Sequence, residues 1–382
     1  MDAPKRKSRP RSGRGGFMKN LKKFLAIGLT AAMTMGLAAC GSSSSNTAAS
    51  TAADSTAASS AETTAASADS EAASSASSTA DTTAAASDQK FTVGIVQLVQ
   101  HVALDAASQG FEDVLTDTYG DNVTIDYQNA AGDSATCATI VNTFVSNNYD
   151  LILANATPAL QAAAAATNTI PVLGTAITEY GVALGIDNFS GTVGTNVSGT
   201  SDLAPLDQQA AMFAEILPDA KTIGILYCSA EPNSVYQADV VKEALEKAGD
   251  TVNIYTFTDS NDVANVTQTA VSESDALYIP TDNTAASCAE NIDNVARPAG
   301  VPIICGEEGL CKGCGIATLS IDYYELGKTT GNMAVEILNG TKKVSEMPIE
   351  YYENPVREYD ADRCEALGIT PPDGYTAIAE DE

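Results

Sequence analysis

A carboxylate and a carboxamide stand side by side at the end of an apolar run. The run is "ALYIP" (residues 276–280), and Thr281, Asp282 and Asn283 follow it, before an Ala/Ser segment of helical character. A carboxylate at this position can accept hydrogen bonds from the free N–H groups of the first helical turn. It can also face a bound molecule. The pattern therefore allows two roles, a helix cap and a binding group.

Polar residues of the same kind follow the other apolar runs. In chain order they are Gln97, Asn129, "NATPA" (155–159), "GTAITE" (174–179), "CSAEPNS" (228–234) and "CGEEG" (305–309). In open parallel sheets, ligands bind beyond the carboxyl ends of the strands. Each position alone is explained by helix capping, but their recurrence in both halves of the chain favours a binding cleft.

Residues for catalysis do not form a recognisable set. The chain has one histidine, His101, and lacks GxSxG, HExxH and Walker motifs. The paired acids Glu307 and Glu308 lie in a predicted turn, where solvated carboxylates are common. We therefore expect neither enzymatic activity nor a cofactor.

The cysteines favour buried thiols over a metal or redox site. Apart from Cys40 there are seven, an odd number that precludes complete intramolecular pairing: Cys137, Cys228, Cys288, Cys305, Cys311, Cys314 and Cys364. The CxxC in "CGEEGLCKGC" would need a distant fourth ligand to hold a metal, and a redox CxxC usually opens a helix, which Gly315 discourages. Buried thiols, with or without one disulfide in this loop, are expected, and no metal.

Apolar, β-rich runs alternate with helical patterns after residue 88. We predict strands at 91–99, 123–130, 150–155, 170–177, 222–229, 251–257, 276–280 and 301–306. Such continuous apolar runs are typical of parallel strands buried on both faces. Helices are predicted around Phe111, around Val141 with Asp133 as N-cap, and from Asp322 to Gly340. The alternation, repeated in two halves of four strands each, indicates two doubly wound α/β lobes.

The first 88 residues have the composition of an export segment and a tether. Residues 1–40 carry nine basic residues and one acidic residue, and "FLAIGLTAAMTMGLAAC" resembles the processing site of a bacterial lipoprotein, with Cys40 as the lipidated residue. Met18 is a more natural start than Met1. Residues 41–88 are almost entirely Ala, Ser, Thr, Asp and Glu, too poor in large apolar residues to fold, so we expect a flexible tether.

The charge of the chain excludes nucleic acid as a partner. Without residues 1–40, 11 basic and 48 acidic residues remain, a net charge of −37. Such a surface repels phosphate backbones.

Taken together, these motifs resemble one family. "VGIVQLVQHVALDAASQGF", "YQNAAGDSA", "DLILANATPALQAA", "IPVLGTAITE", "SAEPNS", "YIPTDN" and "SIDYYELGKTTGNMAVEIL" are similar to the substrate-binding lipoproteins of ABC importers of the tryptophan/tyrosine type. The similarity covers residues 90–345 in order. It implies the type I periplasmic-binding fold, with two lobes joined by a hinge of several crossings: 89–200 plus 316–345, and 201–315 plus 346–382.

The resemblance also implies a pocket. The family's "HP" is His101-Val102 here, "TP" is kept at Thr157-Pro158, and its "AVTDP" is "AITEY" from Ala176 to Tyr180. Asp282 is the expected partner of a ligand ammonium, because an unpaired charge in a closed cleft is costly. The remaining ligand-binding candidates are Gln97, Asn129, Thr175, Glu231, Asn233, Ser234, Thr281 and Asn283.

The expected protein is a monomeric lipoprotein on the extracytoplasmic face of the bacterial cell membrane. It would capture a small zwitterion, best an aromatic amino acid, and deliver it to ABC permease subunits in the membrane. Alternatives are a sugar, nucleoside or peptide-like ligand, or a sensory role in place of transport. Sugar sites in this fold usually contain stacked aromatic residues and Arg/Asp pairs. The few basic residues of this chain therefore disfavour a sugar ligand.

Overall fold

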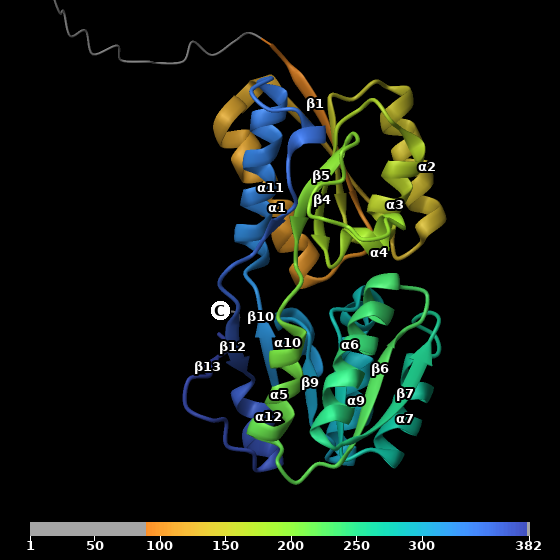
Figure 1. Ribbon diagram of the computed structural model, residues 1–382, viewed down its shortest axis with the longest axis vertical. Coiled ribbons are helices and arrows are strands. Elements are labelled where there is room, and N and C mark those ends of the chain that lie inside the picture. Colours follow the sequence, from red (N-terminus) through yellow and green to blue (C-terminus); the bar gives the residue numbers. More distant parts are fainter. Residues whose placement is uncertain (1–88, 380–382) are drawn as a thin grey trace, which may run out of the picture. The chain divides into compact units, whose positions relative to one another are not determined.

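The structure, a computed structural model, describes residues 89–379 (Figure 1). The predicted signal segment with Cys40 and the predicted tether (41–88) lie outside the described residues. Within the described part, no helix is both long and apolar enough to cross a membrane.

The first lobe is built on an all-parallel sheet of six strands in the order β11-β5-β4-β3-β1-β2. Its strands are β1 (Phe91–Gln97), β2 (Val123–Asn129), β3 (Leu151–Asn155), β4 (Val172–Ile177), β5 (Val197–Ser201) and β11 (Glu350–Tyr351). The chain runs outward in opposite directions from β1, to β2 on one side and to β3 on the other. This reversal is a topological switch point, where doubly wound sheets bind ligands.

The second lobe repeats this plan with a sheet in the order β13-β12-β10-β9-β8-β6-β7. Its strands are β6 (Thr222–Cys228), β7 (Thr251–Phe257), β8 (Ala276–Ile279), β9 (Ile303–Cys305), β10 (Ala317–Ser320), β12 (Val356–Tyr359) and β13 (Thr376–Ala377). Only the β10–β12 pair is antiparallel. The switch point here lies between β6 and β8.

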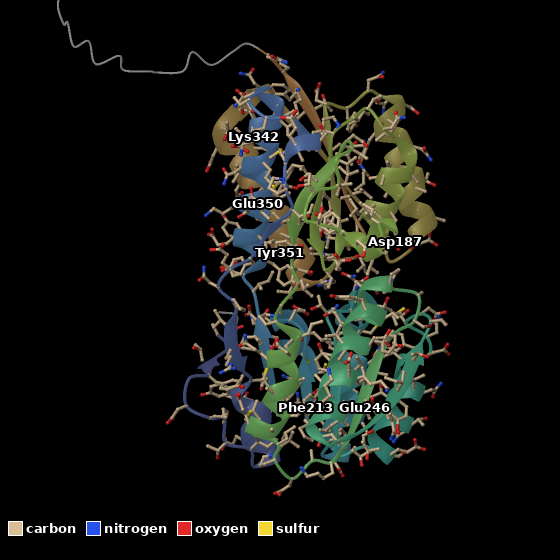
Figure 2. The ribbon with its side chains drawn as sticks, in the orientation of Figure 1. Asp187, Phe213, Glu246, Lys342, Glu350 and Tyr351 are labelled. Carbon is tan, nitrogen blue, oxygen red and sulfur yellow. The ribbon has the colours of Figure 1, made fainter. Side chains whose placement is uncertain are left out.

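Helices follow the strands and cover both faces of each sheet. They are α1 (Val102–Tyr119), α2 (Ser134–Ser146), α3 (Thr157–Ala166), α4 (Tyr180–Leu184), α5 (Leu206–Ile216), α6 (Pro232–Ala248), α7 (Val263–Glu273), α8 (Asn283–Ser287), α9 (Ala289–Ala299), α10 (Glu308–Cys314), α11 (Tyr323–Leu338) and α12 (Ala361–Leu367). Two short 3₁₀ turns lie at Gly120–Asn122 and Val344–Glu346. On α5, Phe213 (labelled in Figure 2) is 2% exposed, whereas Glu246 on α6 pairs with Lys242 at the surface. The alternation of elements confirms the predicted fold class.

The eight strands predicted from the sequence are all present, with ends that shift by no more than two residues. β3, β4, β8 and β9 are buried along their whole length, as expected of strands covered on both faces. The predicted cap at Asp133 is confirmed, because its side chain accepts from the Thr136 N–H at 2.6 Å.

Helix α11 returns to the first lobe, far from its neighbours in sequence. It lies beside α1, as Figure 1 shows, and a Cβ on Gly327 would collide with the Ala107 carbonyl oxygen. Gly110 of α1 likewise faces the Tyr324 carbonyl oxygen, again with no room for a Cβ. The two glycines therefore let the helix backbones approach closely. The predicted cap of α11 is also present, with Asp322 accepting from Glu325 N at 3.0 Å.

Two lobe boundaries differ from the prediction. Ala317–Ser320 is a strand of the second sheet, so the second crossing comes after Ser320 rather than at residue 316. Glu350–Tyr351, labelled in Figure 2, pairs with β5 of the first sheet, so the third crossing comes after Tyr351 rather than at residue 346. Their residues, "ATLS" and "EY", do not form a continuous apolar run like those of the predicted strands, and strand pairing assigns them.

Candidate functional site

A cleft lies where the carboxyl ends of both sheets meet. Its volume is about 290 Å³. Both lobes line it, through Leu98, Val99, Ala131, Gly132, Asp133, Ser134 and Pro158 of the first, and Cys228, Ala230, Glu231, Thr258, Asp259, Ser260, Thr284 and Ser287 of the second. We refer to this space as the interlobe cleft. It occupies the position in which doubly wound sheets bind ligands.

Glu231 is the best-connected carboxylate in the interlobe cleft. It is 3% exposed and stands just before α6. Its Oε2 accepts from the Asn283 side chain at 2.6 Å and from the Asn283 N–H at 3.1 Å. Its Oε1 accepts from the Thr284 hydroxyl at 2.7 Å and N–H at 2.8 Å. These donors surround the Glu231 carboxyl group at the start of α8, and within residues 89–379 no basic side chain is hydrogen-bonded to it.

Asp282 caps α8, which is the first of the two roles that its position in the sequence allows. Oδ1 accepts from the Ala285 N–H at 2.8 Å and Oδ2 from the Cys228 N–H at 2.7 Å, so its carboxylate joins the ends of β8 and β6 at the switch point. Burial, followed by repulsion from Glu231, raises the pKa of Asp282 well above that of an ordinary carboxyl. The side chain is 1% exposed and does not line the interlobe cleft.

His101 connects the two lobes. Its Nε2 lies 3.3 Å from Oδ1 of Asn283, while its buried Nδ1 has no hydrogen-bond partner. Burial lowers the pKa of His101, which favours the neutral ring. Asn233 shows the same pattern, because its Nδ2 donates to the Thr281 carbonyl at 3.2 Å and its buried Oδ1 is unpartnered. Unpaired buried polar atoms cost free energy, so these two atoms are natural contacts for a polar ligand.

The structure therefore brings together one group of the predicted residues. From the second lobe they are Glu231, Asn233, Ser234, Thr281, Asp282 and Asn283, and from the first lobe His101 and Pro158. Thr157, 2% exposed, begins α3 next to Pro158.

Four other predicted residues have their side chains or backbone committed within the first lobe. Gln97 donates to Asp105 at 2.6 Å and so fixes the start of α1. Thr175 bonds to the Thr200 hydroxyl, at 3.3 Å, and to the Thr330 hydroxyl. Asn129 accepts from the Ala131 N–H at 2.7 Å in a turn, and Ala176, 6% exposed, has a positive φ of 52°. None of these four lines the interlobe cleft.

The environment predicted for Glu307 is wrong. Glu307, expected in a solvated turn, is 1% exposed and caps α10 by accepting from the Gly309 N–H at 2.6 Å and from the Leu310 N–H. Burial raises its pKa to about 7. Asp202 and Tyr323 were also missed as a pair; they bond at 3.0 Å where the chain passes between the lobes. No capping signal marked Glu307 in the sequence, because the preferred N-cap residues are Ser, Thr, Asp and Asn.

The thiols are free. All seven cysteines of the described residues are buried and unpaired, which agrees with buried thiols and not with a disulfide. Cys311 and Cys314 lie in the last part of helix α10 rather than in a loop. Within residues 89–379, no group of three or more potential ligands could hold a metal ion.

The sequence is similar to a protein family and to a relative whose ligand is named. Residues 92–380 match the family described as ABC transporter substrate binding protein. A tyrosine-binding protein from Clostridioides difficile (strain R20291) is 36% identical over 286 residues, which are 74% of this chain and 82% of that protein.

Solved structures agree with this match. An ABC domain from Streptococcus pneumonia in complex with L-Trp is 33% identical, with a TM-score of 0.72 over 76% of this chain and 100% of that chain. An open, ligand-free substrate-binding protein with adhesive properties from Clostridium difficile is 38% identical, with a TM-score of 0.59 over 76% of this chain and 100% of that chain. The chain therefore belongs to the family of ABC transporter substrate-binding proteins and has their type I periplasmic-binding fold.

Proposed function

We propose that this chain captures an aromatic amino acid, tyrosine or tryptophan, between its lobes and delivers it to the permease of an ABC importer. In this proposal it acts as a lipoprotein, held on the extracytoplasmic face of the membrane through Cys40. The observation that carries the proposal is the interlobe cleft, which combines a buried carboxylate with apolar walls. The ligands named for the two relatives, tyrosine and L-Trp, support the choice of amino acid.

The ligand ammonium would pair with the carboxylates of the second lobe. Glu231 lines the interlobe cleft, and Asp282 lies behind it within reach of its charge. Burial and, after it, repulsion from Glu231 raise the pKa of Asp282, and an added cation would favour the ionised form of this carboxyl. We propose Glu231 as the direct partner, and Asp282 as a second carboxyl that ionises in response to the bound ammonium.

Groups of the protein are also suited to the carboxylate and the aromatic ring of the ligand. The first turn of α3, beginning at Thr157, presents free N–H groups suited to a carboxylate. Leu98, Val99 and Ala131 supply an apolar wall for an aromatic ring. The unpartnered Nδ1 of His101 would reach a polar atom of the ligand.

Ligand binding is tested by thermal unfolding of residues 89–382 with each of the twenty amino acids, and with nucleosides and sugars. At a concentration 100 times Kd, a ligand adds about 2.7 kcal/mol to the free energy of unfolding, so the midpoint should rise by about 5 °C with L-tyrosine or L-tryptophan. A rise with a sugar or nucleoside alone would replace the amino acid by that ligand class.

Asp282→Asn separates capping from binding. The amide oxygen can still accept from one backbone N–H, so the fold should persist with about 1 kcal/mol lost. Affinity for the amino acid, measured by calorimetry, should fall about tenfold because the amide cannot ionise in response to the ligand ammonium, as Asp282 can. Unchanged affinity in the folded variant would leave Asp282 with the capping role only.

The anchor is tested by Cys40→Ser in the full chain. Expressed in a bacterium, the unsubstituted protein should fractionate with membranes and incorporate labelled palmitate. The variant should do neither, because the serine hydroxyl cannot form the thioether. Cys137→Ser, at a buried thiol, is the matched control and should leave both properties unchanged.

A further inference from the structure

Three side chains meet where the chain passes between the lobes. Asp202 follows β5 in the first crossing, and Tyr323 opens α11 after the second. The Tyr323 hydroxyl donates to Oδ2 of Asp202 at 3.0 Å. Glu307 lies two residues after β9 in the second lobe, where the charge of Asp202 acts on it and its own charge acts on Tyr323. The three residues therefore join two crossings to the second lobe.

The group is buried, acidic and incompletely hydrogen-bonded. Asp202, Glu307 and Tyr323 are 4%, 1% and 6% exposed, respectively. Oδ1 of Asp202 has no partner, although it is buried. A buried carboxylate oxygen without a donor disfavours the charged form strongly. A neutral, protonated Asp202 is therefore the form that suits this arrangement.

No basic group offsets these acids among the described residues that act on Asp202. Tyr323 on α11 and Thr178 after β4 are hydrogen-bonded to it. Asp202 in turn adds to the effect of burial in raising the pKa of Tyr180 on α4 and of Glu307 before α10. Burial raises the pKa of Asp202 to about 6, and the hydrogen bond to Tyr323 only partly opposes it. Glu307 is influenced in addition by its neighbour Glu308, and Tyr323 is hydrogen-bonded to Thr281.

A cavity of about 290 Å³ adjoins the group and is lined by Glu307, Tyr323 and Tyr352, among others. The lobes are therefore not tightly packed on this side of the crossings. A small separation of the lobes would admit water to the acids and lower the cost of their ionisation.

We propose that Asp202, Tyr323 and Glu307 form a proton-dependent latch that favours the closed arrangement of the lobes when Asp202 and Glu307 are protonated. The latch regulates the site of the proposed function and rests on it for the ligand-binding readout only. Closing buries the acids, so the closed form binds protons more readily than the open form. Closure is then strongest in acid, and it weakens as the pH rises from about 4 to about 7, the upper bound being the raised pKa of Glu307.

The test compares the unsubstituted protein with Asp202→Asn, whose amide resembles the protonated acid in shape and cannot ionise. L-tyrosine and L-tryptophan are titrated calorimetrically between pH 5 and 7.5. We expect the affinity of the unsubstituted protein to fall about tenfold over this range, and that of Asp202→Asn to fall less than about threefold. Asp207→Asn, at a nearby exposed acid of α5, should behave like the unsubstituted protein.

A second measurement needs no ligand. Small-angle scattering of the ligand-free protein should show a more compact form at pH 5 than at pH 7.5, and Asp202→Asn should remove most of the difference. If Asp202→Asn does not fold, Glu307→Gln, which keeps one acceptor oxygen for the α10 cap, takes its place. Compaction that depends on pH and on Asp202 would support the latch even if calorimetry shows that neither amino acid binds, so failure of the latch and failure of the proposed ligand can be told apart.

Equal pH dependence of affinity and of compactness in the unsubstituted and substituted proteins would overturn the latch. Asp282 has a raised pKa of its own, so some pH dependence of affinity should survive in every variant. The decisive quantity is therefore the difference between Asp202→Asn and Asp207→Asn, and not the slope of either alone.

Discussion

Glu231→Ala is expected to abolish amino-acid binding and to lower the free energy of unfolding by about 1–3 kcal/mol. The substitution removes the acceptor for the N–H and side chain of Asn283 and for the N–H and hydroxyl of Thr284. Buried donors left without partners keep their full desolvation cost. It also removes the carboxylate that we propose as the partner of the ligand ammonium.

Urea unfolding and calorimetry with L-tyrosine and L-tryptophan measure the two effects separately. Glu243→Ala is the matched control, because Glu243 lies on the same helix with a 69% exposed side chain and pairs only with exposed Lys247. It should change the free energy of unfolding by less than about 0.5 kcal/mol and leave affinity unchanged. Glu231→Gln refines the test, since its amide oxygen keeps part of the network while its charge is lost. Binding retained in a folded Glu231→Gln would exclude Glu231 as the ammonium partner.

Gly327→Ala is expected to destabilise the first lobe by about 2–3 kcal/mol, although alanine is the better helix former. A Cβ at this position would strike the Ala107 carbonyl oxygen, which belongs to a helix backbone and cannot turn aside. Helices α1 and α11 would have to move apart. Because α1 begins at His101, we also expect weaker ligand binding.

Gly340→Ala serves as the control for Gly327→Ala. Gly340 has a positive φ of 67° and open space around it, so its substitution strains the backbone without a collision and should cost about 1 kcal/mol. Urea unfolding of both variants compares the two costs. A Gly327→Ala protein as stable as the unsubstituted one would show that the helices have room to adjust.

The sequence was sufficient for the parts of the fold that local patterns encode. The eight predicted strands follow from runs of β-branched and apolar residues, and their alternation with helices predicts doubly wound lobes. Two of them, β2 and β7, lie at sheet edges and are only partly buried. The caps at Asp133 and Asp322 follow from their place before a helical pattern. Such features depend on neighbours a few residues away, which the sequence displays directly.

The strands β5, β10, β11, β12 and β13 were not predicted. Each is assigned by pairing with a strand elsewhere in the chain: β5 with β4, β10 with β9, β11 with β5, and β12 with β10 and β13. Two of these strands, β10 and β11, also shift the lobe boundaries from the predicted positions. Whether such a short segment becomes a strand depends on the strand it pairs with in the folded chain, and not on its own sequence pattern.

For the candidate site, too, the sequence predicted some features and the tertiary structure determined the others. Sequence patterns marked Gln97, Thr175 and Glu231 as equal candidates, because each is polar and stands near the end of a strand. Tertiary packing separates them: Gln97 bonds to α1, Thr175 to Thr330 of α11, and Glu231 lines the interlobe cleft.

The sequence by itself determined the fold class, the strand ends at which polar groups gather, and the resemblance that names the family. The tertiary structure alone decided which of those groups face the other lobe, and that Asp202 and Glu307 are buried near one another. The physical reason is that burial and hydrogen bonding depend on atoms brought close by folding. Residues 202 and 307 share an environment that no stretch of sequence contains.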